Sequence, residues 1–300
     1  MSILIPQLFN GLSLGSILLL IALGLAITFG QMNIINMAHG EFIMIGAYTT
    51  YVLQQVFIQY LPQAAFGYYF ILTIPLAFII AAFLGFVMEK TIVQFLYKRP
   101  LDSLLATWGV SLILQQTART IFGSPNVAVI APEWLNGGLT LLGVTFPYKR
   151  LFILGLVFIS ICFLFIYLYK TTSGRRMKAV TLNREMASCL GVSTRRVDSM
   201  AFALGSGFAG IAGCCLTLLG SIGPTLGTAY IVDAFMIVIL GGVGRLNGTI
   251  LAALMLGILS TFVELSTSAT IAKVIVFSCI ILFLQWKPTG LIGAKVRALD

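Results

Sequence analysis

Long apolar stretches constrain the fold of this 300-residue chain more than any other feature. A helix needs roughly 20 mostly apolar residues to cross about 30 Å of hydrocarbon, and a backbone inside a bilayer must satisfy its own hydrogen bonds. The candidate stretches are residues 3–29, 34–60, 68–97, 101–122, 151–169, 199–222, 230–243, 246–265 and 269–286. We therefore predict an all-α fold, a polytopic transmembrane helical bundle with about nine crossings and a range of eight to ten.

Two of these stretches are weaker candidates than the others. Residues 230–243 form a short stretch, and residues 101–122 contain Gln115, Gln116 and Arg119. The composition still supports a membrane protein, because 59% of the residues are hydrophobic and only 9% are charged. An average soluble domain carries about 25% charged residues, and a disordered chain is poor in apolar residues, so both classes are excluded.

The basic residues predict the orientation of the helices. With residues 170–198 in the cytoplasm and nine alternating crossings, 14 of the 18 Lys and Arg residues lie on the cytoplasmic side. Seven of them are in that loop, and the others are Lys90, Lys98, Arg99, Arg245, Lys287, Lys295 and Arg297. This positive-inside bias places the N-terminus outside and explains the net charge of +9 without a nucleic-acid partner. A re-entrant segment at 230–243 would move the tail's cations outside, so we interpret that segment as a crossing.

The whole chain, residues 1–300, is predicted to form a single transmembrane domain with two polar loops. Residues 123–150 are rich in Pro and Gly and predict an external loop of turns. Residues 170–198 are polar but not rich in turn residues, and they predict a cytoplasmic loop that contains a short surface helix. The first thirty residues contain no Lys or Arg, so we expect the first stretch to stay as a membrane helix rather than act as a signal peptide.

Motifs for catalysis and nucleotide binding are absent from the sequence. It contains no phosphate-binding loop ending in Gly-Lys-Ser/Thr, no H-E-x-x-H and no G-x-S-x-G, and His39 is its single histidine. The five cysteines include no C-x-x-C pair, which leaves no metal-binding pattern. We therefore expect no enzyme activity, catalytic residue, metal or cofactor. If the chain transports a solute against a gradient, another subunit or an ion gradient must drive it.

Several glycines predict close helix packing. Gly205-Ser-Gly207-Phe-Ala-Gly210 matches the G-x-G-x-x-G pattern of dinucleotide-binding folds, but it lies inside a predicted membrane helix. Small residues four apart let two membrane helices approach closely. We assign helix packing to Gly11, Gly15, Gly205, Gly207, Gly210 and Gly213.

A group of polar residues lies at the turn from the first apolar stretch into the second, in Asn33-Ile-Ile-Asn36-Met-Ala-His39-Gly40-Glu41. A charged side chain near the centre of a bilayer costs roughly 2.5–3.5 kcal/mol and usually faces a partner or an aqueous path. This group is therefore either a broken helix beside a permeation path or a cytoplasmic turn with ordinary caps. Asp233 is a second intramembrane acid, which either caps a short helix or lines the path.

The loop residues Arg184-Glu-Met-Ala-Ser-Cys-Leu-Gly191 predict a short helix with an exposed role. Met186, Ala187 and Leu190 supply apolar contacts, Arg184 and Glu185 supply polar anchors, and Gly191 ends the helix. One interpretation is a surface helix held by anionic membrane lipid. The other is a docking helix that receives a rigid-body push from a separate motor.

The loop also carries a family resemblance. Glu185-Met-Ala187-x-x-x-Gly191 is similar to the E-A-A-x-x-x-G coupling loop of ABC importer permeases. Together with Leu8-Phe-Asn10-Gly11, Ile35-Asn36-Met-Ala-His39-Gly40-Glu41 and Leu240-Gly241-Gly242-Val-Gly244, it resembles the LivH-like permeases of branched-chain amino acid importers over almost the whole chain.

Within that family, the chain most resembles the urea permeases of the UrtB type. The similarity is carried by Gly46-Ala-Tyr-Thr-Thr-Tyr51, Arg99-Pro-Leu-Asp-Ser-Leu-Leu-Ala-Thr-Trp108, Phe202-Ala-Leu-Gly-Ser-Gly207, Tyr230-Ile-Val-Asp233-Ala-Phe-Met and Phe283-Leu-Gln-Trp286-Lys-Pro. The resemblance implies a multi-pass subunit of the bacterial inner membrane. Its implied partners are a second, homologous permease subunit, two cytoplasmic ATPase subunits and a periplasmic substrate-binding protein.

We therefore expect a permease subunit of an ATP-driven importer for a small polar solute, urea. A path for this neutral solute needs amide, hydroxyl or carbonyl groups, and the candidates are Asn36, His39, Glu41, Thr107, Ser111 and Asp233. Residues 184–187, 190 and 191 would couple the path to the ATPases. The alternatives are an importer of branched-chain amino acids or short amides, and a passive urea channel working alone.

Overall fold

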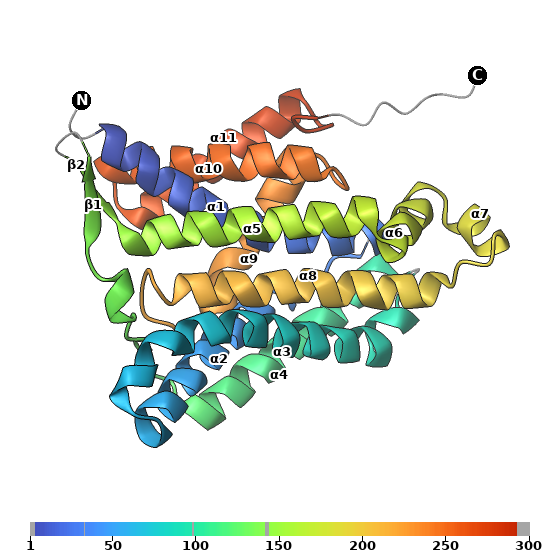
Figure 1. The fold of residues 1–300 in the computed structure, drawn as a ribbon. Helices are drawn as coiled ribbons and strands as arrows, with labels where there is room; N and C mark the ends of the chain where they lie inside the picture. Colours follow the sequence, from blue (N-terminus) through green and yellow to red (C-terminus); the bar gives the residue numbers. More distant parts are fainter. Residues whose placement is uncertain (1–3, 33, 98, 142–143, 293–300) are drawn as a thin grey trace.

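The computed structural model describes residues 4–32, 34–97, 99–141 and 144–292. Its long helices lie side by side around a common core (Figure 1). The helices are α1 (Leu4–Met32), α2 (His39–Tyr60), α3 (Tyr69–Thr91), α4 (Pro100–Phe122), α5 (Tyr148–Lys170), α6 (Thr172–Leu182), α7 (Arg184–Cys189), α8 (Thr194–Leu216), α9 (Leu226–Gly241), α10 (Leu246–Ser266) and α11 (Ala269–Trp286). The basic residues Lys98, Lys295 and Arg297 lie outside the described residues.

Each predicted apolar stretch overlaps one helix, so the all-α, polytopic prediction is confirmed. Among the described residues, six helices are long and apolar enough to cross a membrane. These are α1, α3 with its flanking turns (Phe66–Phe95), α5, α8, α10 and α11, and α9 is a shorter apolar helix. α2 and α4 are not among the six, so the number of nine crossings stays a prediction.

The loop between α4 and α5 forms a small cap at one end of the bundle. It contains η3 (Glu133–Leu135) and an antiparallel hairpin of β1 (Gly138–Leu141) and β2 (Val144–Pro147). Trp134 Nε1 donates a hydrogen bond to the carbonyl of Gly67, 2.7 Å away, which ties the cap to η1 (Gln63–Tyr68) ahead of α3. η2 (Val93–Phe95) follows α3 at the opposite end.

Helices α1 and α8 form the centre of the bundle, because both are largely buried by their neighbours. Their backbones cross where glycine faces glycine: a Cβ atom on Gly24 would lie 2.4 Å from the carbonyl oxygen of Gly205. A Cβ atom on Gly46 of α2 would lie only 2.0 Å from the oxygen of Gly210 on α8. No side chain fits at these positions, so the glycines set the separation between the helices.

The six glycines singled out in the sequence all lie at helix crossings. Gly11 and Gly15 of α1 face α10, where a Cβ on either would come within 3 Å of backbone atoms. Gly207 faces the Phe78 ring of α3, and a Cβ on Gly213 would lie 2.0 Å from the carbonyl oxygen of Ile43 on α2. Gly205 and Gly210 make the contacts described above.

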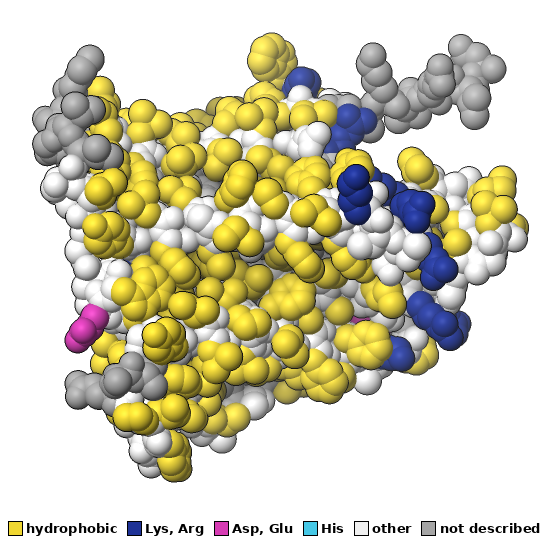
Figure 2. Space-filling model, viewed as in Figure 1, with side chains coloured by type: hydrophobic (Ala, Val, Ile, Leu, Met, Phe, Trp, Pro, Cys, Tyr) yellow, Lys and Arg dark blue, Asp and Glu magenta, His cyan; other side chains and the backbone are white. Residues whose placement is uncertain are grey.

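Charge is distributed unevenly along the bundle. On the face shown in Figure 2, basic side chains gather at the end that carries α6 and α7, and apolar side chains cover the middle. This arrangement has the form that the positive-inside rule predicts for a helical membrane protein. The end with α6 and α7 therefore corresponds to the predicted cytoplasmic side.

Candidate functional site

The second long helix begins inside the bundle rather than at its end. α1 ends at Met32, the residues just before α2 are not helical, and α2 starts at His39. The His39 ring lies beside the middle of α1, with Nε2 3.1 Å from the carbonyl oxygen of Ile21. Residues 34–38 therefore lead the chain back into the bundle without a helix, which corrects the predicted helical start at residue 34.

A second helix begins at the same place. Gly227, in the first turn of α9, lies against Gly40, and a Cβ on Gly40 would be 2.5 Å from the Gly227 oxygen. The N-termini of α2 and α9 therefore meet inside the bundle. Helix ends within a membrane leave backbone groups without intrahelical partners and are tolerated where protein or an aqueous path surrounds them. The broken-helix prediction for this segment agrees with this geometry.

A row of polar side chains on α4 faces this break. Ser103, Thr107, Ser111 and Gln115 are buried and spaced by four residues, so they share one face of the helix. Thr107 Oγ1 accepts a hydrogen bond from the backbone N–H of Met37, 3.1 Å away. This bond ties the non-helical segment 34–38 to α4.

Glu41 in the first turn of α2 is the acid at the centre of this site. Its Oε1 atom accepts hydrogen bonds from Ser111 Oγ and Gln115 Nε2, each at 2.8 Å. We call Asn36, Glu41, Thr107, Ser111 and Gln115 the polar cluster. Its members come from α2, α4 and the segment between α1 and α2, and the bonded pair Glu41 and Gln115 is separated by 74 residues in sequence.

Two atoms of the polar cluster remain without a hydrogen-bond partner among the described residues: Glu41 Oε2 and Asn36 Nδ2. Both side chains are 1% exposed, and no described Lys or Arg forms an ion pair with Glu41. A buried acceptor and a buried donor without partners each cost about 1–3 kcal/mol.

Of the six predicted path residues, Glu41 and Ser111 are hydrogen-bonded to each other, and Thr107 bonds the backbone of Met37, the neighbour of Asn36. His39 instead packs against α1. Asp233 lies well inside α9 and pairs with Lys273 of α11, whose Nζ is 3.2 Å from Oδ2 and 3.1 Å from the Ala229 oxygen. Asp233 therefore neither caps α9 nor joins the cluster.

The sequence reasoning missed Gln115, which it treated only as a weakness of the fourth stretch. The signal that could have found it is its spacing of four from Ser111 and eight from Thr107. This spacing places the three side chains on one helix face.

The loop between α5 and α8 folds into α6 and α7, which confirms the predicted short helix. Asn183 caps α7, because its Oδ1 accepts a hydrogen bond from the N–H of Met186 at 2.9 Å. Gly191 follows with a φ of +80°, a conformation that favours glycine. Both ends of this helix are therefore specified locally.

The side chains of α7 divide between two environments. Leu182, Met186 and Leu190 follow one another at a spacing of four and are 87%, 59% and 77% exposed. Ala187 is buried, and Glu185 is exposed. Met186 of α7 and Leu190 just after it are therefore uncovered, as is Leu182 at the end of α6, whereas Ala187 packs against the bundle.

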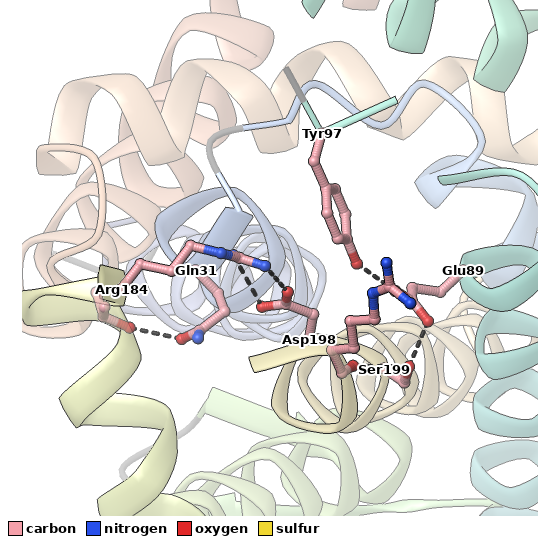
Figure 3. A network of polar contacts seen from close by, with 8 residues as sticks. Gln31, Glu89, Tyr97, Arg184, Asp198 and Ser199 are labelled. Atoms are coloured by element: carbon pink, nitrogen blue, oxygen red, sulfur yellow. Dashed lines mark hydrogen bonds and ion pairs between the residues drawn. The ribbon is translucent and has the colours of Figure 1, made fainter. Parts of the chain in front are cut away.

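Arg184 turns toward the bundle, as Figure 3 shows. Its guanidinium forms a two-pronged pair with the fully buried Asp198 of α8, with Nη1 3.4 Å from Oδ1. It also lies over the Tyr97 ring, with 5.2 Å between Cζ and the ring centre. The Tyr97 hydroxyl and the Ser199 hydroxyl both donate to the Glu89 carboxylate of α3. Arg184 thus joins α7 to α8 and, through Tyr97, to α3.

Two further features hold this end together. Burial raises the pKa of Tyr97 well above its usual range, so the phenol stays protonated and donates to Glu89. Thr181 Oγ1 of α6 donates to Gln31 Oε1 at the end of α1, 2.5 Å away. Movement of α6 and α7 is therefore mechanically connected to α1, α3 and α8.

Comparison with known proteins places these features in a family. The family model described as the permease component of branched-chain amino acid transport systems matches residues 7–284. The chain belongs to this permease family. It is thus a multi-pass inner-membrane protein and a permease of the ABC transporter type.

The similarity to individual permeases extends over nearly the whole chain. It is 30% identical over 298 residues to the high-affinity branched-chain amino acid permease LivH of Salmonella typhimurium, with 96% of this chain and 95% of the relative covered. LivH of Escherichia coli K12 is also 30% identical, over 300 residues with the same coverage. BraD of Pseudomonas aeruginosa is 28% identical over 301 residues, again with 96% and 95% covered. No solved structure matches the chain.

Proposed function

We propose that this permease forms, with a homologous partner subunit, the path by which urea enters the cell. Two cytoplasmic ATPase subunits would drive the movement, and a periplasmic binding protein would deliver the solute. The observation that carries the proposal is the polar cluster, in which Glu41 and Asn36 leave one acceptor and one donor unsatisfied. Urea offers N–H donors and a carbonyl acceptor on one small, neutral molecule.

The geometry supports a defined role for each side chain. Glu41 Oε2 would accept from a urea N–H, and Asn36 Nδ2 would donate to the urea carbonyl. Ser111 and Gln115 hold the other carboxylate oxygen and so orient Glu41. Because α4 supplies these two donors and packs mainly against α2, a shift of α4 would open or close the site in an alternating-access cycle.

The exposed apolar side chains on and beside α7 support a coupling role. Met186 and Leu190, together with Leu182, would insert into a pocket on an ATPase subunit, and Glu185 would add a polar contact. Arg184 would transmit the push through its pair with Asp198. Ala187 packs α7 against the bundle, and Gly191 ends the helix.

A branched-chain amino acid is the second candidate for the solute. Glu41 is a buried acid without a cation among the described residues, and an α-ammonium group would supply that charge. The names of the relatives LivH and BraD favour this candidate as well.

Uptake of labelled urea by the reconstituted transporter, with leucine and short amides as competitors, separates the candidates. Competition by amides but not by leucine supports urea, and the reverse pattern supports an amino acid. Uptake by the purified chain in liposomes without ATPases would instead indicate a passive channel.

The cluster itself is tested by Ser111→Ala and Asn36→Ala, with Thr117→Ala as the matched control. Thr117 lies on α4 as well, but its hydroxyl bonds only the carbonyl of its own helix at Ile113. We expect uptake to fall at least ten-fold in the first two variants and to stay unchanged in the control. Unchanged uptake in Asn36→Ala would remove Asn36 from the path.

A further inference from the structure

A cavity of about 510 Å³ opens at the end of the bundle that carries α6 and α7. Its walls come from α1, α5, α6 and the turn between α9 and α10. Ile27, Leu168 and Leu246 form part of an apolar wall, and Tyr169 lies beside them. The cavity is distinct from the polar cluster and shares no residue with it.

Two cations line this cavity, Lys178 of α6 and Arg245 at the start of α10. Both side chains are half-buried, and neither forms an ion pair with a described acid. Lys178 lies over the Tyr169 ring, 2.9 Å from its centre. Two like charges at one partly buried site repel each other, and an anion between them would relieve this repulsion.

The remaining polar lining also suits an anion. Asn247 lines the cavity and can donate hydrogen bonds, whereas no Asp or Glu contributes to the lining. The cavity thus combines a basic, hydrogen-bonding part with an apolar wall. This combination matches a phosphate group attached to acyl chains. A free anion would bind the basic part but would make no contact with the apolar wall.

The position of the cavity fits the same ligand. Basic side chains gather at this end on the face shown in Figure 2, as expected for the cytoplasmic side of the bilayer. Basic pockets between membrane helices on this side bind the head groups of anionic lipids. Tyr169 is a residue type enriched at the membrane–water interface.

We propose that this cavity binds one anionic phospholipid, with its phosphate between Lys178 and Arg245 and an acyl chain along Ile27, Leu168 and Leu246. The lipid would connect α6 to the turn before α10. Since α6 leads directly into α7, the lipid content of the cytoplasmic leaflet would then influence how firmly α7 is held.

The test measures retention of phosphatidylglycerol by the purified full chain, by native mass spectrometry, with phosphatidylcholine as the neutral reference. The test variant is Lys178→Ala/Arg245→Ala. The matched control is Arg175→Ala/Arg176→Ala, which removes two charges from exposed positions on α6 outside the cavity lining. One basic side chain near an anionic surface contributes about a five-fold gain, so we expect a roughly thirty-fold loss in the test variant and little change in the control.

Two further variants complete the test. Lys178→Arg/Arg245→Lys keeps both charges and is expected to retain the lipid. If the double alanine variant fails to fold, Lys178→Ala and Arg245→Ala are measured singly, and each should reduce lipid retention about five-fold. Equal losses in the test and control variants, or no preference for phosphatidylglycerol over phosphatidylcholine, would overturn the proposal. Displacement of the lipid by millimolar inorganic phosphate would indicate a site for a soluble phosphate instead.

Discussion

Replacing Arg184 with alanine should weaken the attachment of α7 to the bundle more than its position at the surface suggests. The guanidinium is the ion-pair partner of Asp198, whose side chain is fully buried. Truncating Arg184 therefore leaves a buried carboxylate without its positive partner. Asp198→Asn, in contrast, removes the charge that needs a partner and keeps a side chain of the same shape.

The expected magnitude follows from the exposure of the two partners. Removing one member of a fully buried pair costs about 3–5 kcal/mol, whereas an exposed pair contributes about 0–1 kcal/mol. The Arg184 side chain is 40% exposed and that of Asp198 is 0% exposed, so water reaches only one side of the pair. We expect Arg184→Ala to lower the free energy of unfolding by about 2–3 kcal/mol and Asp198→Asn by about 1 kcal/mol.

Thermal unfolding in detergent of the two single variants and the double variant measures this coupling. The double variant should be more stable than the sum of the single effects predicts, by about 1–2 kcal/mol. In the reconstituted transporter, Arg184→Ala should also reduce solute-stimulated ATP hydrolysis, since α7 would be held less firmly. Additive effects, or a loss below about 0.5 kcal/mol for Arg184→Ala, would refute the reasoning.

Three other predictions concern packing, a helix end and an ion pair. Gly46→Val should prevent folding, because its Cβ would lie 2.0 Å from a carbonyl oxygen of α8. Gly109→Ala should instead raise the midpoint of thermal unfolding slightly, because no atom lies within 4 Å of the added Cβ and alanine favours a helix. Gly191→Ala should cost about 1–2 kcal/mol in thermal unfolding, because φ is +80°, and Gly191→Asn should cost less. Lys273→Met should lower the free energy of unfolding by about 1–3 kcal/mol, because it leaves the Asp233 carboxylate, which is 8% exposed, without its partner. Lys273→Arg keeps the positive charge and should retain most of this stability.

Much of the fold could be predicted from the sequence because the signals are local or compositional. The length and apolarity of a stretch decide whether it forms a membrane helix, and no distant residue is needed to read them. The C-terminal end of α7 was equally predictable, since Gly191 acts on its own backbone, whereas the cap by Asn183 was not predicted from the sequence. Small residues four apart, Gly11 and Gly15 in α1 and Gly205, Ala209 and Gly213 in α8, likewise predicted close helix packing on these two helices.

The residue at which α2 begins could not be predicted from the sequence in the same way. The apolar stretch that begins at residue 34 predicts a helix there, yet α2 begins at His39, and the preceding segment is bonded to α4 from Met37 to Thr107. That bond joins residues 70 positions apart, and local propensity carries no information about it. Tertiary contacts overrode the local pattern.

The sequence by itself determined the membrane class, the approximate helices, the close helix crossings and the short helix α7. Only the tertiary structure decided which polar groups meet: Glu41 with Ser111 and Gln115, Arg184 with Asp198, and Asp233 with Lys273. The physical reason is the range over which each signal acts. Burial and capping depend on one residue and its near neighbours, whereas a buried polar group is stable only when the whole bundle brings a partner to it.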